Sequence, residues 1–124
     1  PAALPSLIKA YRIQDKARNV GFDWEERAQV WDKVKEEISE VDAEAIAGNS
    51  EALESEFGDL FFSLVNAARL YGITPENALE KTNKKFIRRF SHIETETAEA
   101  GKKLNELTLA EMDKLWNEAK KLEK

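Results

Sequence analysis

Two pairs of carboxylates share one helical spacing in this chain. Glu37 and Glu40 form the first pair, and Glu56 and Asp59 form the second. A separation of three residues places both members of a pair on one face of a helix, about one turn apart. The second pair directly precedes the apolar run 60–65, and acids that enter a core are costly unless something compensates them. Hard divalent cations take carboxylate oxygens, so Mg²⁺ is the first candidate for that role.

The residues between the pairs favour a hairpin that would bring them together. Residues 48–50 read Gly-Asn-Ser, a break short enough to favour two antiparallel helices. Glu40 lies 8 residues before Gly48, and Glu56 lies 6 residues after Ser50. This offset is roughly 3 Å at the helical rise, so the pairs can face each other at matching levels. A solvated acidic face, a charge effect at a helix start and a structural salt bridge remain alternatives.

Helical periodicity also orders the acids around their helices. Glu37 lies nearest the apolar positions Val34 and Val41, so it should point inward, whereas Glu36 lies further out. On the following helix, a narrow polar stripe interrupts a mostly apolar surface. Its members are Glu56, Asp59, Ser63 and Asn66. Such a stripe on a helix that is otherwise expected to be buried indicates the lining of a site.

Length and composition predict a single all-α domain. The chain has 124 residues, 42% hydrophobic and 35% charged, which is typical of a soluble globular protein. Only 5 glycines and 3 prolines interrupt it, which favours long helices. The net charge of −5 argues against nucleic acid as the main partner.

The expected location is the cytoplasm. The chain has no cysteine, so disulfides and thiolate chemistry are excluded, which fits a reducing compartment. No apolar run approaches the length of a membrane span, and no signal peptide is visible. Because the chain begins Pro-Ala-Ala without Met, we expect it to be a fragment of a longer protein.

Caps, stops and apolar periodicity predict five helices packed as an antiparallel bundle, with no strand. The fourth helix opens with Thr74 as the cap and Pro75 as its first residue, and the fifth opens with a capping box from Thr108 to Glu111. Ser6, Asp23 and Ser50 are the expected caps of the first three helices. The expected bounds are Ser6 to about Val20, Asp23 to about Ala47, Ser50 to about Tyr71, Thr74 to near Ala98, and Thr108 onward.

The fourth helix carries a candidate cationic counterpart to the acids. Lys85 and Arg89 are one turn apart, at the boundary of its apolar face, where they could reach phosphates or the acids. The alternative is a pair of surface cations whose stems cover apolar neighbours. Trp116 lies in the apolar stripe of the last helix with Lys120 one turn later, a pattern more typical of a core than of a ligand contact.

These segments resemble the MazG-type nucleoside triphosphate pyrophosphohydrolases, within the all-α NTP pyrophosphatase superfamily. The family pattern is Glu-Glu-x-x-Glu followed by Glu-x-x-Asp, which residues 36–40 and 56–59 match. Residues 20–24, 61–66 and 83–90 extend the resemblance over essentially the whole chain. The chain is most similar to the C-terminal catalytic domain of two-domain bacterial members.

The resemblance implies Mg²⁺-dependent hydrolysis of a nucleoside triphosphate to a monophosphate and pyrophosphate, by a helical homodimer or higher oligomer. A broad base range and a role in cleaning the nucleotide pool are family-level expectations. Glu36 is a candidate to orient or deprotonate the attacking water, and a supporting role behind the ligands is equally open. The other implied positions are Glu37, Glu40, Glu56 and Asp59 as Mg²⁺ ligands, Lys85 and Arg89 at the triphosphate, and Trp116 and Lys120 near the nucleotide.

Three other functions are alternatives to this one. A base-specific pyrophosphatase would share the same acids, and a non-catalytic dimerisation or regulatory module would not need them at matched levels. A di-iron carboxylate bundle requires Glu-x-x-His pairs on two helices. With His92 as its single histidine, the chain cannot build that site.

Overall fold

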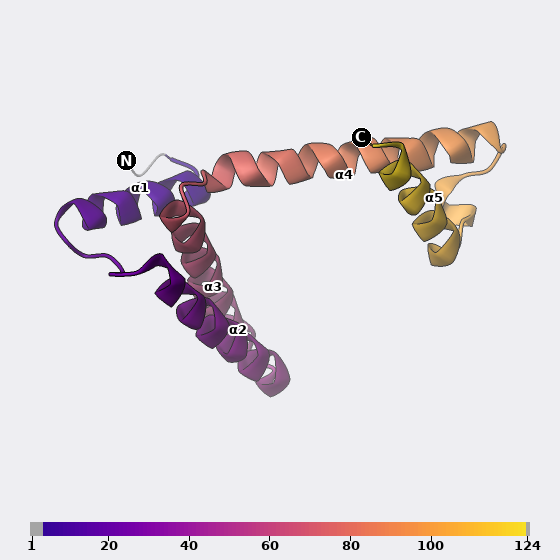
Figure 1. Ribbon diagram of the computed structural model, residues 1–124. Coiled ribbons are helices and arrows are strands. Elements are labelled where there is room, and N and C mark those ends of the chain that lie inside the picture. Colours follow the sequence, from indigo (N-terminus) through magenta and orange to yellow (C-terminus); the bar gives the residue numbers. More distant parts are fainter. Residues whose placement is uncertain (1–3, 124) are drawn as a thin grey trace. The chain divides into compact units, whose positions relative to one another are not determined.

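The computed structural model describes residues 4–123 and confirms the all-α class (Figure 1). Residues 1–3, on which the expectation of a fragment rests, lie outside these residues. Within them the chain forms five α-helices and two short 3₁₀ helices, with no strand. The α-helices are α1 (Ser6–Asn19), α2 (Val30–Ala47), α3 (Ser50–Leu70), α4 (Pro75–Glu99) and α5 (Leu109–Leu122), and the 3₁₀ helices are η1 (Arg27–Gln29) and η2 (Leu104–Glu106).

The chain divides into two compact units, and the boundary falls in α4 between Ala78 and Leu79. The first unit holds α1, η1, α2 and α3, and the second holds η2, α5 and most of α4. None of the helices in the described part of the chain is long and apolar enough to cross a membrane.

The predicted hairpin of α2 and α3 is confirmed, and the two helices run side by side in opposite directions (Figure 1). Gly48 ends α2 with a φ of 75°, a left-handed conformation that glycine adopts at little cost. The cap of α3 differs from the prediction. The Asn49 side chain accepts a hydrogen bond from the Ala52 amide at 3.2 Å, so Asn49 is the cap and Ser50 is the first helical residue.

The first helix begins at Ser6 as expected, but Ser6 is not its cap: Pro5 occupies the cap position, and no side chain caps that end. The predicted start of the second helix was wrong. The second helix begins at Val30 rather than at Asp23, because the Asp23 carboxylate is engaged elsewhere: it accepts two hydrogen bonds from the Arg69 guanidinium. A bidentate pair with a buried arginine is stronger than a cap bond, so it sets the path of this segment.

A small apolar core and a few specific contacts hold the first unit together. Val30, Val34 and Ala67 are buried against each other, with Leu60 and Leu70 packed around them. One contact closes the open end of the hairpin, and a second joins α1 to α3. The Trp31 indole donates to the Tyr71 hydroxyl at 2.9 Å, and the Gln14 amide donates to the Phe62 carbonyl at 2.9 Å.

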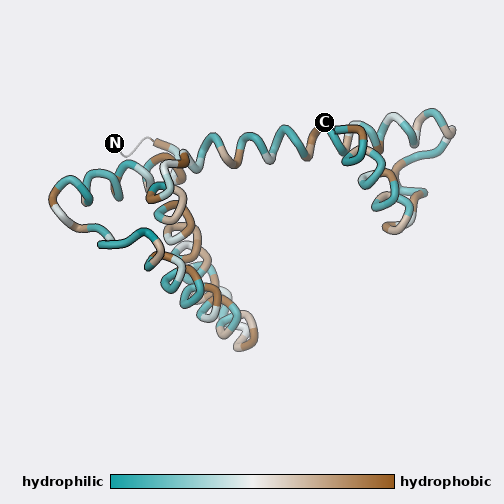
Figure 2. The backbone as a smooth tube through the Cα atoms, viewed as in Figure 1, coloured by the Kyte–Doolittle hydropathy of each residue, from teal (hydrophilic) through white to brown (hydrophobic). Residues whose placement is uncertain are grey.

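The apolar run of α3 was predicted to be buried, but much of it is exposed. Phe61 is 59% exposed and Leu64 is 43% exposed, and Phe57 and Phe62 are exposed as well. The hydropathy colouring marks α3 as one of the more apolar segments of the chain (Figure 2). An apolar periodic pattern therefore predicted a hydrophobic face here, but this face is not covered by the core of the first unit.

The second unit is organised by aromatic contacts between α4 and α5. The rings of Phe86 and Trp116 lie 5.3 Å apart, and Ile93 and Ala119 are buried. The predicted cap of α5 is confirmed. The Thr108 hydroxyl accepts from the Glu111 amide at 3.1 Å, and the Glu111 carboxylate accepts from the Thr108 amide at 2.9 Å.

Substitution of the α5 cap should weaken the second unit. We expect Thr108→Ala to lower the free energy of unfolding by about 1 kcal/mol, because the Glu111 amide loses its acceptor. Urea unfolding followed by circular dichroism measures the change. Thr95→Ala, at an exposed threonine within α4, is the control and should not lower stability, because alanine is the better helix former. Equal effects of the two substitutions would contradict the capping role.

Candidate metal centre and its cavity

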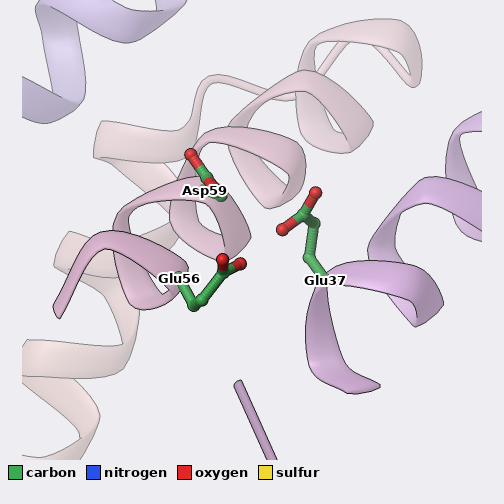
Figure 3. Close-up of side chains that lie close together, drawn as sticks. All are labelled: Glu37, Glu56 and Asp59. Carbon is green, nitrogen blue, oxygen red and sulfur yellow. The ribbon is translucent and has the colours of Figure 1, made fainter. Parts of the chain in front are cut away.

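Three of the predicted acids converge across the hairpin. Glu37 comes from α2, and Glu56 and Asp59 come from α3. One carboxylate oxygen of each lies within 4.8 Å of one oxygen of the others. Figure 3 shows the three side chains turned toward the same space between the two helices. The matched levels that were counted from the turn therefore occur in the folded hairpin.

Two of these acids have an oxygen that suits a cation. Glu37 is buried, as its inward position predicted, with only 3% of the residue exposed. Its Oε2 atom and the Oε2 atom of Glu56 are buried and have no hydrogen-bond partner in the described structure. Buried carboxylate oxygens without partners are costly, and a divalent cation would satisfy them. The residues present thus fit a hard cation with oxygen ligands.

Glu40 lies beside this group. A hydrogen bond with the Glu56 carboxyl, and the negative charge of Glu37, raise the pKa of Glu40 to about 7. Two carboxyl groups can share a hydrogen bond only when one keeps its proton, and this favours the protonated form of Glu40. Glu36 is on the outer side of α2, and 57% of its side chain is exposed.

A lysine that the sequence analysis did not single out completes the charged cluster. Lys33 Nζ lies 2.8 Å from Glu37 Oε1 and 3.6 Å from Glu36 Oε1. Its hydrogen bond to Glu37 raises the pKa of Lys33, which keeps the ammonium charged. The signal was its position one turn before Glu37, but a lysine among exposed acids reads as part of a solvated face.

A cavity of about 600 Å³ opens beside the acids, within the first unit. Glu37, Asp59 and Lys33 lie at its wall, and so do Ser63 and Asn66 of the predicted polar stripe. Its remaining walls are aromatic and aliphatic side chains, a backbone segment before α2, and a few polar groups. These further lining residues are Ile13, Gln14, Ala17, Phe22, Asp23, Trp24, Val30, Phe62 and Arg69.

A polar network closes one wall of the cavity. Arg69 Nη2 donates to Asp23 Oδ1 at 2.7 Å and to Asn66 Oδ1 at 2.7 Å. The Arg69 side chain is 5% exposed and that of Asp23 is 17% exposed. This hydrogen bonding holds the pKa of Asp23 below its ordinary value. Arg69 was missed because its partner lies 46 residues away in sequence, although it follows Asn66 on the same helical face.

The predicted substrate contacts lie in the second unit. Arg89 forms a bidentate pair with Glu123, at 3.0 and 2.8 Å, and its guanidinium lies 5.2 Å from the centre of the Trp116 ring. This pair holds the pKa of Glu123 below its ordinary value. Lys85 and Lys120 are exposed on α4 and α5. The structure thus groups Arg89 with Trp116, and it groups the acids within the first unit.

Comparison with known proteins assigns the chain to a family. The model of the MazG nucleotide pyrophosphohydrolase domain matches residues 25–94, more than half of the chain. The chain belongs to the MazG family. The matched residues include the acids of both pairs as well as Lys85 and Arg89, whereas Trp116 and Lys120 lie beyond them.

Named bacterial proteins are similar to this MazG-family chain over nearly all of its length. It is 41% identical over 117 residues to the nucleoside triphosphate pyrophosphohydrolase/pyrophosphatase MazG of Thermotoga maritima, which covers 94% of the chain and 45% of that relative. It is 42% identical over 125 residues to a nucleoside triphosphate pyrophosphohydrolase of Escherichia coli K12, at 99% and 48% coverage. The chain therefore spans about half the length of the curated relatives it matches.

A shorter match links the chain to a protein of Bacillus subtilis. The uncharacterized protein YabN is 57% identical over 72 residues, which is 58% of this chain and 15% of that protein. A segment similar to part of this chain thus also occurs within a much longer protein.

Neutralising Asp23 should destabilise the protein in a pH-dependent way. The folded-state pKa of Asp23 lies below its ordinary value of 3.8, so the pair with Arg69 contributes fully above that pH and is lost as the pH falls through the folded-state pKa. We expect Asp23→Asn to lower the unfolding free energy by about 2 kcal/mol at neutral pH, with a deficit that shrinks on acidification.

Urea unfolding of parent and variant from neutral to acidic pH measures this deficit. Asp15→Asn, which breaks an exposed pair with Arg18, is the matched control and should cost little at any pH. A deficit that stays constant on acidification would mean that the charge of Asp23 is not what stabilises the wall.

Removing one acid should stabilise the protein when no metal is bound. In chelator at about pH 8, above the value near 7 at which Glu40 ionises, we expect Glu40→Gln to raise the melting temperature by relieving repulsion from Glu37 and Glu56. Glu54→Gln, on the exposed side of α3, removes the same charge away from the cluster and should change the melting temperature less. A lower melting temperature for Glu40→Gln would indicate that this acid stabilises the fold.

Proposed function

We propose that this chain hydrolyses nucleoside triphosphates to nucleoside monophosphates and pyrophosphate, with Mg²⁺ as its cofactor. The observation that carries the proposal is the acidic cluster: two of its carboxylate oxygens are buried without a partner in the described structure, and its members Glu37 and Asp59 line a cavity of about 600 Å³. The names of the relatives from Thermotoga maritima and Escherichia coli support the same reaction.

The acids divide into ligands and a neighbour. We assign Glu37, Glu40, Glu56 and Asp59 to hold Mg²⁺, which supplies charge neutralisation at phosphate oxygens. Three of them share the cluster, and Glu40 is close enough to Glu56 and Glu37 for their charges to raise its pKa. Glu36 is exposed beside them, which suits a carboxylate that orients or deprotonates the attacking water, although support of Glu37 fits its position equally well.

The nucleoside would occupy the cavity beside the acids. Its volume lies in the range of small-ligand pockets. Phe22, Trp24 and Phe62 contribute flat aromatic surface, and every base can stack on such a surface. The Arg69 guanidinium is engaged by Asp23 and Asn66 and is not free to select a base, whereas the buried Gln14 Oε1 in the cavity wall has no hydrogen-bond partner in the described structure. From the stacking surface we infer a broad base range, and a base-specific pyrophosphatase that selects through Gln14 is the alternative outcome of the assay.

We assign Lys85 and Arg89 to the triphosphate. Lys85 is exposed and can add a point charge, whereas Arg89 is already oriented by Glu123 and stacked near Trp116. The pair with Glu123 uses Nε and Nη2 of Arg89, so a phosphate oxygen would be contacted through Nη1 or by displacing Glu123. Negative charge that develops during hydrolysis is stabilised by cations placed in this way. Lys120 lies on the same helix as Trp116 and is assigned to the nucleotide.

The working form is proposed to be a homodimer or higher oligomer in the cytoplasm, and the chain is proposed to act as a single domain of a longer protein. The exposed apolar residues of α3, Phe61 and Leu64 among them, support association with a second copy. Removal of unwanted nucleotides from the cellular pool is the proposed role.

Two conservative substitutions test the metal assignment. We expect Glu40→Gln and Asp59→Asn to lower Mg²⁺-dependent pyrophosphate release by at least about 100-fold, since bound-cation charge stabilisation is worth several kcal/mol. Glu54→Gln should retain the parent rate. A panel of common nucleoside triphosphates, assayed for pyrophosphate with and without Mg²⁺, compares the base ranges.

The outcomes separate the alternatives. Full activity in both variants would contradict the ligand assignment. Where activity is lost, circular dichroism should show that the helices are intact. Activity with one base alone would favour the specific enzyme. Absence of pyrophosphate release from the parent chain, with all bases and Mg²⁺, would favour a non-catalytic dimerisation or regulatory module.

A further inference from the structure

Lys33 occupies an unusual place for a surface lysine. Its ammonium lies 2.8 Å from Glu37 Oε1, although the Glu37 side chain is only 4% exposed. The Lys33 side chain is 41% exposed, so its stem runs from solvent toward the buried acid. It also lines the same cavity as Glu37 and Asp59.

The pair contributes little as a helix-stabilising contact. Lys33 precedes Glu37 by four residues, and this order stabilises a helix less than the reverse order does. What it does compensate is a buried carboxylate: Glu37 Oε1 has the ammonium, while Oε2 is buried without a hydrogen-bond partner in the described structure. One oxygen of Glu37 is therefore paired with a positive charge of the same chain, and the other has no partner among the described residues.

We propose that Lys33 is an internal counter-ion of the acidic cluster, which stabilises Glu37 when no metal is bound and competes with the divalent cation for it. The inference rests on the metal site of the proposed function. A positive charge this close to the shared carboxylate must oppose a second cation there. The flexible and partly exposed stem lets the ammonium move toward solvent when the cation binds.

If Lys33 competes with the cation, its removal should change metal-free stability and cation affinity in opposite directions. Loss of the ammonium should destabilise the metal-free protein, because it leaves a buried charge uncompensated. The same loss should strengthen cation binding. A lysine with only a structural role would produce the first effect without the second, and a lysine that orients Glu37 as a ligand would weaken cation binding.

The test compares lysines of one helix in the absence of nucleotide. Lys33→Met keeps most of the stem and removes the charge, and Lys33→Arg keeps the charge. Lys35→Met is the matched control, because Lys35 is exposed on α2 and forms no ion pair with the acids of the described residues. Calorimetric titration with Mg²⁺, and with Mn²⁺ followed by electron paramagnetic resonance, measures affinity, and melting in chelator measures metal-free stability.

We expect Lys33→Met to bind both cations roughly five- to tenfold more tightly than Lys35→Met, the size of one partly solvated like-charge interaction, and to melt at a lower temperature in chelator. Lys33→Arg should resemble the parent in both. If Lys33→Met does not fold without metal, Lys33→Gln, whose amide can still donate to Glu37, carries the same comparison. Equal or weaker cation binding by the uncharged variant overturns the competition.

The proposed function fails in a different way. A parent chain that binds neither cation contradicts the metal site and with it the competition. Tighter binding by Lys33→Met in a chain that releases no pyrophosphate would establish the competition and contradict the reaction alone.

Discussion

Carboxylates that face one another across α2 and α3 repel, and this repulsion opposes the packing that joins the two helices. The contacts that resist it are few, since Val30, Val34 and Ala67 make up the buried apolar cluster. The hairpin therefore relies on its ends, where Gly48 turns the chain and Trp31 bonds to Tyr71. Acids that cost stability in this way are retained in a fold when they have something to bind.

How far the sequence could predict this arrangement depended on the range of each signal. The turn at residues 48–50 and the capping box at Thr108 are local, and both were predicted, with the cap of α3 displaced by one residue to Asn49. The convergence of Glu37 with Glu56 followed from counting along two helices from one turn. These features need only short stretches of chain and regular geometry.

Long-range pairing was beyond the same reasoning. Asp23 has the sequence context of a helix cap, but its carboxylate pairs with Arg69 instead. This pairing depends on how the segment before α2 lies against α3. The exposure of Phe61 was missed for a related reason. An apolar periodic pattern is the same whether its face meets the core of one chain or is left for another surface, so periodicity alone cannot predict burial.

The tight turn at Gly48 also limits how this hairpin can change length during evolution. Its two arms run in opposite directions, so residues added to one arm alone would slide one set of acids past the other and rotate it by about 100° per residue. Whole helical turns added to both arms would carry the tip outward and leave the facing residues in register, because the ends that the turn joins would then keep their faces. Insertions within the arms should thus come as matched pairs of about three or four residues, a regularity of length that substitutions alone do not reveal.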